Sequence, residues 1–420
     1  MDKYKENRNK INMYKNKKSP EISKKNTGSK NKPKKIDDTP AKSKEAIFCK
    51  GKTDYLFIGI LSIIIILGLI TLLSASSSKA LSNTGDPYAL LKKQFKYMMV
   101  GILACVFVSR INYKKFNRLT WSRFCYIISI FLIIIVRIKG TSEGGAQRWL
   151  GVGSFSFQPS EMIKLLVIGF NSIRFSNLHT FKTKEERKKE IWKIVAVDGL
   201  IFSLIFVLQS HLSAFVVLAG VTISQAMIVG LPVKLVVGLI MFGVAVLVTL
   251  SKIANPNSPS YRLRRISNWV DPFQDREDKG WQIIQSLYAI GSGGLLGVGI
   301  GQSKQQYFLP ELENDFIGAI YAEETGFIGI LCLIVLFTIL LARGFIIAKN
   351  AKDIFGKVLA TGIVSLFAIE LIINLMVITK IIPVTGMALP FFSYGGTAMI
   401  INLVAVGILL SIARVSNERN

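Results

Sequence analysis

The sequence is poor in cysteine, and its cysteines are not arranged for cysteine chemistry. Cys49, Cys105, Cys125 and Cys332 show no paired spacing. Three of them lie in or beside apolar runs, where a thiol behaves as a small hydrophobic group. The pattern argues against a disulfide framework and against a metal cluster held by thiolates.

We also expect the N-terminal region not to be a secretory leader. The first 53 residues are too long for the basic part of a signal peptide, and no small-residue cleavage site follows the first apolar run. They hold 17 Lys and Arg against 6 Asp and Glu, with almost no aliphatic side chains. Because they cannot bury enough apolar surface to fold, we expect residues 1–53 to form a disordered basic tail. Attraction to the anionic lipid headgroups of the membrane accounts for the positive charge of this tail. Nucleic-acid binding is therefore not needed to explain it.

Long apolar runs dominate the rest of the chain. Half of the 420 residues are hydrophobic, and the mean hydropathy is +0.43. Apolar runs of this length cross a hydrocarbon core of about 30 Å as helices. We predict an all-α polytopic membrane protein with about ten transmembrane helices in residues 54–414 and a short tail at 415–420. The predicted spans are 55–77, 94–111, 121–138, 161–175, 191–208, 212–231, 233–250, 316–348, 358–379 and 394–414.

The distribution of Lys and Arg predicts the side that each loop faces. Loops on the side of the basic tail carry clusters of Lys and Arg, whereas the loops near 82–91 and 381–393 are poor in both. The positive-inside rule therefore places both termini in the cytoplasm. Segment 251–315 then forms a large extracytoplasmic loop, and loops of that length are usually functional. It contains a helical stretch at 281–290 followed by glycines that permit close backbone approach.

Two charged residues open the fourth span. Ionisable groups at membrane depth are costly and usually have a partner or a function. Glu161 and Lys164 are three residues apart and share one face of a helix. They can form an internal ion pair that fixes packing, or line a cavity that positions an anionic ligand. Just upstream, Arg148 suits phosphate binding and Trp149 suits an interfacial anchor.

Another acidic residue lies where the large loop meets the eighth span. Asp315 is placed for general-base catalysis and equally for capping the helix, so spacing leaves both roles open. Glu311 and Glu313 are expected nearer open solvent. Glu323 lies about two turns deeper and is interpreted as structural or cavity-lining.

The segment before the last span contains two prolines and three glycines within residues 382–396. Such backbone at membrane depth must be buried in protein or line a cavity. With the basic cluster of Arg262, Arg264 and Arg265, it predicts a helical bundle with an outward-facing cavity. This arrangement fits a transporter or an enzyme that acts on a lipid-linked anionic substrate, and the residues alone leave the choice open.

In order and spacing, these motifs resemble those of the SEDS family of shape, elongation, division and sporulation proteins, which includes FtsW, RodA and SpoVE. The resemblance covers roughly residues 54–414. The matching segments are AQRWL at 146–150, QPSE at 158–161 with Lys164, QIIQSLYAIGSGG at 282–294, LPE at 309–311 with DFI at 315–317, EE at 323–324 with Gly326, and LPF at 389–391 with SYGG at 393–396.

The resemblance implies a peptidoglycan glycosyltransferase of the bacterial cytoplasmic membrane. Such enzymes polymerise lipid II into glycan strands at the outer face and release undecaprenyl pyrophosphate. It assigns the family's essential aspartate to Asp315, its functional tryptophan to Trp149, and its buried Glu/Lys pair to Glu161 and Lys164. It also implies a class B penicillin-binding protein, a transpeptidase, as partner, with other division or sporulation membrane proteins. Segments 285–291 and 301–304 are more similar to the division and sporulation branch.

We therefore expect a catalytic Asp315 with a substrate-binding set around it. A lipid II flippase and a non-catalytic scaffold that recruits a transpeptidase are the rival functions, and retention of Asp315 favours the enzyme. Two departures from the family pattern are Asn314 in place of Thr and Gly318 in place of Phe. The sequence leaves open whether a divalent cation takes part. The predicted substrate-binding residues are Arg148, Trp149, Glu161, Lys164, Arg262, Arg264, Arg265, Glu323 and Ser393.

Overall fold

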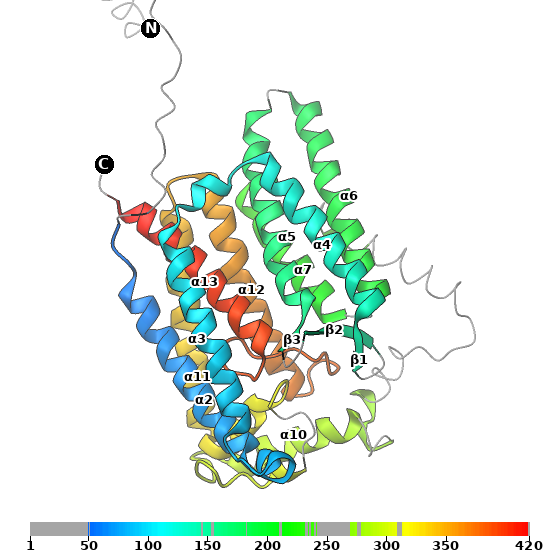
Figure 1. The fold of residues 1–420 in the computed structure, drawn as a ribbon, viewed down its shortest axis with the longest axis vertical. Coiled ribbons are helices and arrows are strands. Elements are labelled where there is room, and N and C mark those ends of the chain that lie inside the picture. The colour runs from blue at the N-terminus through cyan, green and yellow to red at the C-terminus, as the bar shows by residue number, and fades with distance from the viewer. Residues whose placement is uncertain are drawn as a thin grey trace, which may run out of the picture. The chain divides into compact units, whose positions relative to one another are not determined.

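Long helices, one small sheet and a few short 3₁₀ turns make up the part of the chain that the computed structural model describes (Figure 1). That part comprises residues 49, 51–143, 146–152, 155–181, 183–209, 212–231, 269–274, 279–308 and 313–418, with isolated positions between 234 and 241. The helices are α2 (Tyr55–Thr84), α3 (Ala89–Arg110), α4 (Leu119–Lys139), α5 (Pro159–Ser176), α6 (Lys184–Leu208), α7 (Leu212–Ile228), α10 (Lys279–Gly293), α11 (Ile317–Asn350), α12 (Ile354–Ile378) and α13 (Gly396–Asn417).

Local chemistry sets where these helices begin and end. The Asp54 side chain accepts a hydrogen bond from the Phe57 amide at 3.0 Å and so caps the start of α2. At the other end of α2, Gly85 adopts a left-handed conformation with φ of 72°, as C-terminal glycines commonly do. Asp353 caps α12 in the same way, by accepting from the Gly356 amide at 2.6 Å.

Helix α12 lies between two groups of helices. On one side α2, α3, α11 and α13 pack together, and on the other side α4, α5, α6 and α7 do so (Figure 1). Helix α12 contacts members of both groups and is buried around most of its circumference. A helix that is apolar on every face is expected to occupy the centre of a helical bundle.

All predicted spans except the seventh are helical in the structure, and span 233–250 lies outside the described residues apart from isolated positions. Among the described helices, α2, α4, α11, α12 and α13 are long and apolar enough to cross a membrane. The beginning of α2 and the end of α13 lie at one end of the bundle, where Asn417 donates to the Lys52 carbonyl at 3.1 Å. The chain is therefore an all-α polytopic membrane protein in its main architecture. Most of the predicted tail 1–53 lies outside the described residues.

A small antiparallel sheet follows α4 and was not predicted. It consists of β1 (Thr141–Glu143), β2 (Ala146–Val152) and β3 (Phe155–Phe157), in the order β1-β2-β3. β1 and β3 have only three residues each, and the seven residues of β2 do not alternate between apolar and polar side chains. The sheet matters because Arg148 and Trp149 both lie on its central strand, β2, rather than on a loop.

The glycine-rich segment after α10 packs closely on α11. The amide of Val298 donates to the carbonyl of Glu323 at 3.0 Å, and that of Phe327 donates to Gly294 at 2.9 Å. Gly326 interrupts α11 with φ of 67°, and a Cβ at this position would lie 2.3 Å from the Gly297 nitrogen. The expectation that glycines permit close backbone approach here is confirmed.

The segment between α12 and α13 turns back into the bundle. The rings of Phe391 and Phe367 lie 4.9 Å apart, and those of Phe392 and Tyr321 lie 5.3 Å apart. Both phenylalanines of the loop are buried. The prediction of an irregular segment that is buried in protein is confirmed.

Candidate functional site

Asp315 lies at the start of α11, at the end of the bundle opposite Asn417; we call this end the Asp315 end. The residue is half-buried. The N-cap position of α11 is occupied by the next residue, Phe316, whose own side chain makes no capping hydrogen bond. Asp315 therefore lies one residue before the N-cap position. A Cβ built on Gly386, which has φ of 71°, would lie 3.3 Å from Asp315 Oδ2, so the loop before α13 passes directly beside the carboxylate.

Asn374 of α12 fixes the backbone around Asp315. Its side-chain amide donates to the Asp315 carbonyl at 2.8 Å and to the Met387 carbonyl at 2.7 Å. The residue is fully buried. Asn374 thereby joins the start of α11 to the loop that passes the carboxylate. Sequence reasoning missed it, although an amide within a strongly apolar helix is itself a signal of a buried polar contact.

Glu313 is buried, and the expectation that it lies near open solvent is wrong. Its exposed fraction is 7%. Its side chain forms an ion pair with Lys79 at 2.7 Å, and its carbonyl accepts from the Tyr394 amide at 2.8 Å. The expectation was based on the polar sequence around Glu313, whereas α2 and the loop before α13 fold over it. Glu311 lies outside the described residues.

Glu161 and Lys164 form the predicted ion pair, with 2.8 Å between Glu161 Oε2 and Lys164 Nζ. Glu370 of α12 accepts a second hydrogen bond from the same ammonium group and was not predicted. The Lys164 side chain is 3% exposed and that of Glu370 is 4% exposed. This burial favours an internal ion pair over the alternative that Glu161 and Lys164 line a cavity that positions an anionic ligand. We call the three residues the Lys164 triad.

The Lys164 triad is linked to Asp315 through α12. Glu370 and Asn374 are four residues apart, so they lie on one face of that helix. Glu370 accepts from Lys164, and Asn374 donates to the Asp315 backbone one turn further on. A displacement of α12 would therefore move Glu370 and Asn374 together, and with them their contacts to Lys164 and to the Asp315 backbone.

Arg148 and Trp149 lie on β2, and both are half-buried. The Arg148 Nε donates to the Gln209 carbonyl at the end of α6, at 3.4 Å. The sheet is joined to the start of α13, because the Thr397 hydroxyl donates to the Ser156 carbonyl at 3.1 Å. The sheet therefore lies at the Asp315 end, as the predicted site requires.

Glu323 is held inside the protein rather than facing a cavity. It is 1% exposed. Its carboxylate accepts hydrogen bonds from the last turn of α10 and from the segment after it, which favours the structural alternative for this residue. The donors are the hydroxyls of Ser292 and Ser303 and the amides of Lys304 and Gln305.

Ser393 also holds backbone in place. Its hydroxyl accepts from the Leu389 amide at 2.8 Å, and its carbonyl accepts from Gln94 of α3 at 3.3 Å. It therefore shapes the loop beside Asp315. The three arginines of the predicted set, Arg262, Arg264 and Arg265, lie outside the described residues.

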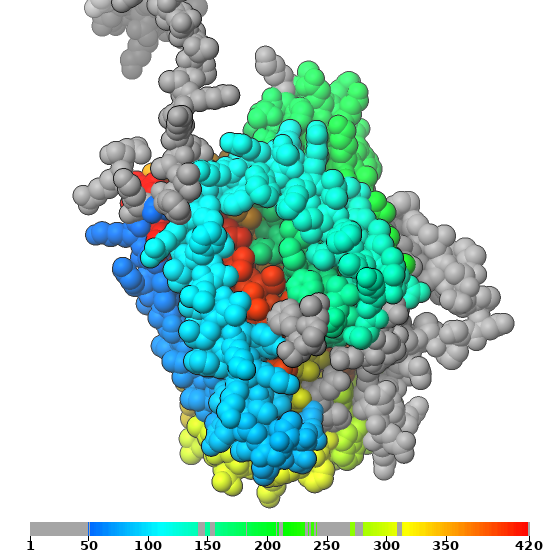
Figure 2. Space-filling model, in the orientation of Figure 1, coloured from blue at the N-terminus to red at the C-terminus, as the bar shows by residue number. Residues whose placement is uncertain are grey.

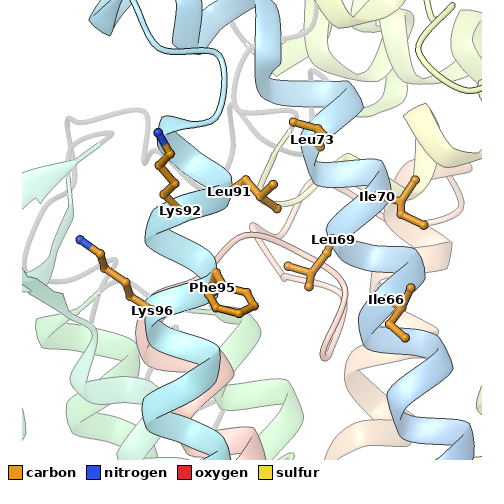
Figure 3. Close-up of a pocket in the computed structure, with 8 residues that line it drawn as sticks. All are labelled: Ile66, Leu69, Ile70, Leu73, Leu91, Lys92, Phe95 and Lys96. Carbon is orange, nitrogen blue, oxygen red and sulfur yellow. The ribbon is translucent and has the colours of Figure 1, made fainter.

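An apolar groove of about 510 Å³ runs between α2 and α3. Figure 3 shows four apolar side chains pointing toward the space between the helices, those of Leu69, Leu73, Leu91 and Phe95. Lys92 and Lys96 extend from the opposite side of α3. In Figure 2, α13 is visible between α3 and α4. The groove is lined by Ile66, Leu69, Ile70, Leu73, Leu91, Lys92, Phe95 and Lys96.

Within the described residues, no group of three or more His, Cys, Asp or Glu side chains gathers at a position suited to a metal ion.

Comparison with known proteins agrees with the geometry. The chain is 39% identical over 376 residues to stage V sporulation protein E of Bacillus subtilis, covering 87% of this chain and 98% of that protein. It is 36% identical over 356 residues to the probable peptidoglycan glycosyltransferase FtsW of Trichlorobacter lovleyi, covering 82% of this chain and 89% of that protein.

Solved structures show the same architecture. One chain of a peptidoglycan synthase complex that coordinates polymerization and crosslinking matches with a TM-score of 0.70 and 25% identity, over 87% of this chain and 99% of that one. Thermus thermophilus RodA matches in fold with a TM-score of 0.63 and 23% identity, over 87% of this chain and 98% of that one. The model of the FtsW/RodA/SpoVE family, described as cell cycle proteins, matches residues 54–418, and the chain belongs to this family.

Proposed function

We propose that this protein is a peptidoglycan glycosyltransferase that polymerises lipid II at the outer face of the cytoplasmic membrane. The placement of Asp315 carries the proposal. Asp315 is half-buried just before the start of the apolar helix α11, and its carboxylate lies beside Gly386. A hydrogen bond from Asn374 holds its backbone carbonyl. The start of α11 is at the depth at which we expect a lipid-linked sugar to sit. The names of the FtsW relatives support the same activity.

In the proposed reaction, a sugar hydroxyl of one lipid II attacks the anomeric carbon of another. The new bond joins the hydroxyl oxygen to the anomeric carbon, and the bond between that carbon and the pyrophosphate oxygen breaks. Asp315 takes the proton of the attacking hydroxyl as general base. Because pyrophosphate is a good leaving group, cationic contacts are enough to stabilise it. Arg148 is our candidate on the described part of the chain, and the arginines at 262, 264 and 265 are candidates from the sequence.

This activity requires the Asp315 end to face outward. The Lys and Arg distribution supports cytoplasmic termini, with segment 251–315 outside. The test is cysteine labelling in a variant that lacks the native cysteines. Asn83→Cys should react with a membrane-impermeant thiol reagent in intact protoplasts, whereas Lys349→Cys should react only after lysis. The reverse pattern would place the reaction on the wrong side.

The protein is also proposed to act with a transpeptidase that crosslinks the new strand, and we assign that partner to the class B penicillin-binding proteins. The structural match to a chain of a synthase complex that combines polymerization and crosslinking supports this partnership. The similarity to SpoVE and FtsW supports a role in sporulation or division. Other division or sporulation membrane proteins are proposed as further partners.

The decisive experiment uses the purified protein with its partner transpeptidase and labelled lipid II in proteoliposomes. The wild type should form glycan polymer, and Asp315→Asn should lower the rate about 100- to 10,000-fold, the usual contribution of a general base. Asp86→Asn is the matched control, because Asp86 lies on the short loop between α2 and α3. Polymerisation by Asp315→Asn near the wild-type rate would refute the assignment. Movement of lipid II across the bilayer without polymer would favour the flippase.

A further inference from the structure

The turn that contains Asp315 is held by a second charged pair at the Asp315 end. Lys79, near the end of α2, lies 2.7 Å from Glu313 Oε1. The Lys79 side chain is 44% exposed, and the Glu313 side chain is 10% exposed. Glu313 is only two residues from Asp315 and belongs to the same turn. The pair therefore connects α2 directly to the backbone that carries the catalytic carboxylate.

Three separate elements hold this turn. Lys79 of α2 contacts the Glu313 side chain, Tyr394 of the loop before α13 donates to the Glu313 carbonyl, and Asn374 of α12 donates to the Asp315 carbonyl. The contacts from Tyr394 and Asn374 are hydrogen bonds to backbone carbonyls. The contact with Lys79 is the electrostatic one, and it acts on a carboxylate that has been taken out of water.

Burial makes Glu313 dependent on Lys79. Its second oxygen, Oε2, is buried and has no hydrogen-bond partner among the residues that the structure describes. A buried carboxylate without a compensating cation is unfavourable, so loss of Lys79 would drive Glu313 towards water. Because Asp315 follows in the same turn, that movement would displace its carboxylate from the substrate. A displacement of about 1 Å at a catalytic group is enough to lower a rate about 100-fold.

We propose that Lys79 and Glu313 are positioning residues that hold Asp315 in its reactive place. The inference rests on the proposed function, since it gives Asp315 the role of base. The rival role for Lys79 is direct binding of the substrate pyrophosphate. The two roles differ in one respect: a positioning lysine is needed only while Glu313 is charged, whereas a substrate-binding lysine is needed regardless of Glu313.

The test measures kcat and KM for lipid II polymerisation with Lys79→Met, Lys79→Arg, Glu313→Gln and the double variant Lys79→Met/Glu313→Gln. Lys79→Met should lower kcat about 10- to 100-fold with KM unchanged. Lys79→Arg should keep most of the activity, because it preserves the charge. The double variant should recover activity relative to Lys79→Met, since it removes the stranded carboxylate. Lys92→Met serves as the control, because Lys92 pairs with the exposed loop residue Asp86.

Two results would overturn the proposal. A raised KM with unchanged kcat in Lys79→Met would show substrate binding, and a double variant as slow as Lys79→Met would show that Glu313 is not what Lys79 compensates. Asp315→Asn is assayed alongside to separate the two claims. If it is active, the general base is wrong whatever Lys79 does. If it is inactive and Lys79→Met is fully active, only the positioning role fails.

Discussion

The molecule contains two lysine–carboxylate clusters that look alike in sequence and differ in their surroundings. In the Lys164 triad, the lysine side chain is 3% exposed, and its ammonium group is shared by Glu161 and Glu370. At the Asp315 end, Lys79 is 44% exposed and serves one buried carboxylate, Glu313. The first cluster lies inside the bundle and joins α5 to α12. The second lies at the rim and joins α2 to the turn before α11.

The difference shows how burial decides what a charge contributes. Breaking a fully buried ion pair leaves an uncompensated charge in a poorly polarisable interior, which is strongly destabilising. At the rim, by contrast, Glu313 can move towards water when the half-exposed Lys79 is lost, so the loss of stability is smaller and the position of the turn changes instead. The triad should therefore be visible mainly in stability, and the rim pair mainly in the rate of the reaction that Asp315 catalyses.

The largest effect is expected from Lys164→Met. This variant leaves Glu161 and Glu370 together without their cation, which should cost about 3–5 kcal/mol of folding stability. Lys79→Met, the control at the rim, should cost less than about 1 kcal/mol. Thermal unfolding of the purified variants in the same detergent measures both. Equal losses for the two lysines would remove the distinction between the clusters.

Glu370 lowers the stability expected of the double variant in which both Glu161 and Lys164 are replaced by uncharged residues. Replacing Glu161 by Gln and Lys164 by Met still leaves the Glu370 carboxylate buried without a cation. The triple variant that adds Glu370→Gln should therefore be more stable than the double variant. If the double variant were already as stable, Glu370 would not share Lys164 in the folded protein.

A smaller effect, and one on the rate, is expected from Asn374→Ala. Asn374 lies one turn from Glu370 but contacts the Asp315 turn, so it connects the two clusters. Its loss frees the carbonyls of Asp315 and Met387 and should lower kcat by up to about 100-fold through misplacement of the carboxylate. Asn350→Ala, at the exposed far end of α11, is the control. A loss of stability with unchanged kcat would assign Asn374 to the triad alone.

The smallest effect is expected from the surface pair of Asp86 and Lys92, whose side chains are 38% and 64% exposed. A hydrogen bond from Lys92 holds the pKa of Asp86 below its ordinary value, and the Tyr88 amide acts in the same direction. Because the folded pKa is depressed, any stabilisation is present at neutral pH and is lost as the pH falls through that pKa. Wild type and Asp86→Asn should therefore unfold at nearly the same temperature at neutral pH and coincide in acid. A difference that grows on acidification would reverse this sign.

Particular residues show how far the sequence could predict the site. Asp315, Glu161 and Lys164 stand out because each is an ionisable group beside or within an apolar run, and hydropathy alone marks them. Glu370 and Asn374 gave the same signal within α12, but only their partners reveal what they do. The small sheet could not be predicted, since β1 and β3 have three residues each and β2 shows no alternation of apolar and polar side chains. Glu313 was misplaced because its polar neighbours in sequence are not its neighbours in space.

The sequence by itself determined the class of protein, the positions of the described helices and the family, because apolar run length and motif order are local properties of the chain. The tertiary structure decided which charges meet. Lys164 reaches Glu370 across 206 residues, and Lys79 reaches Glu313 across 234 residues. Helical periodicity fixes the face on which a side chain lies, but the packing of that face against another helix follows from the burial of all the helices at once. That packing sets one lysine in the interior and the other at the rim.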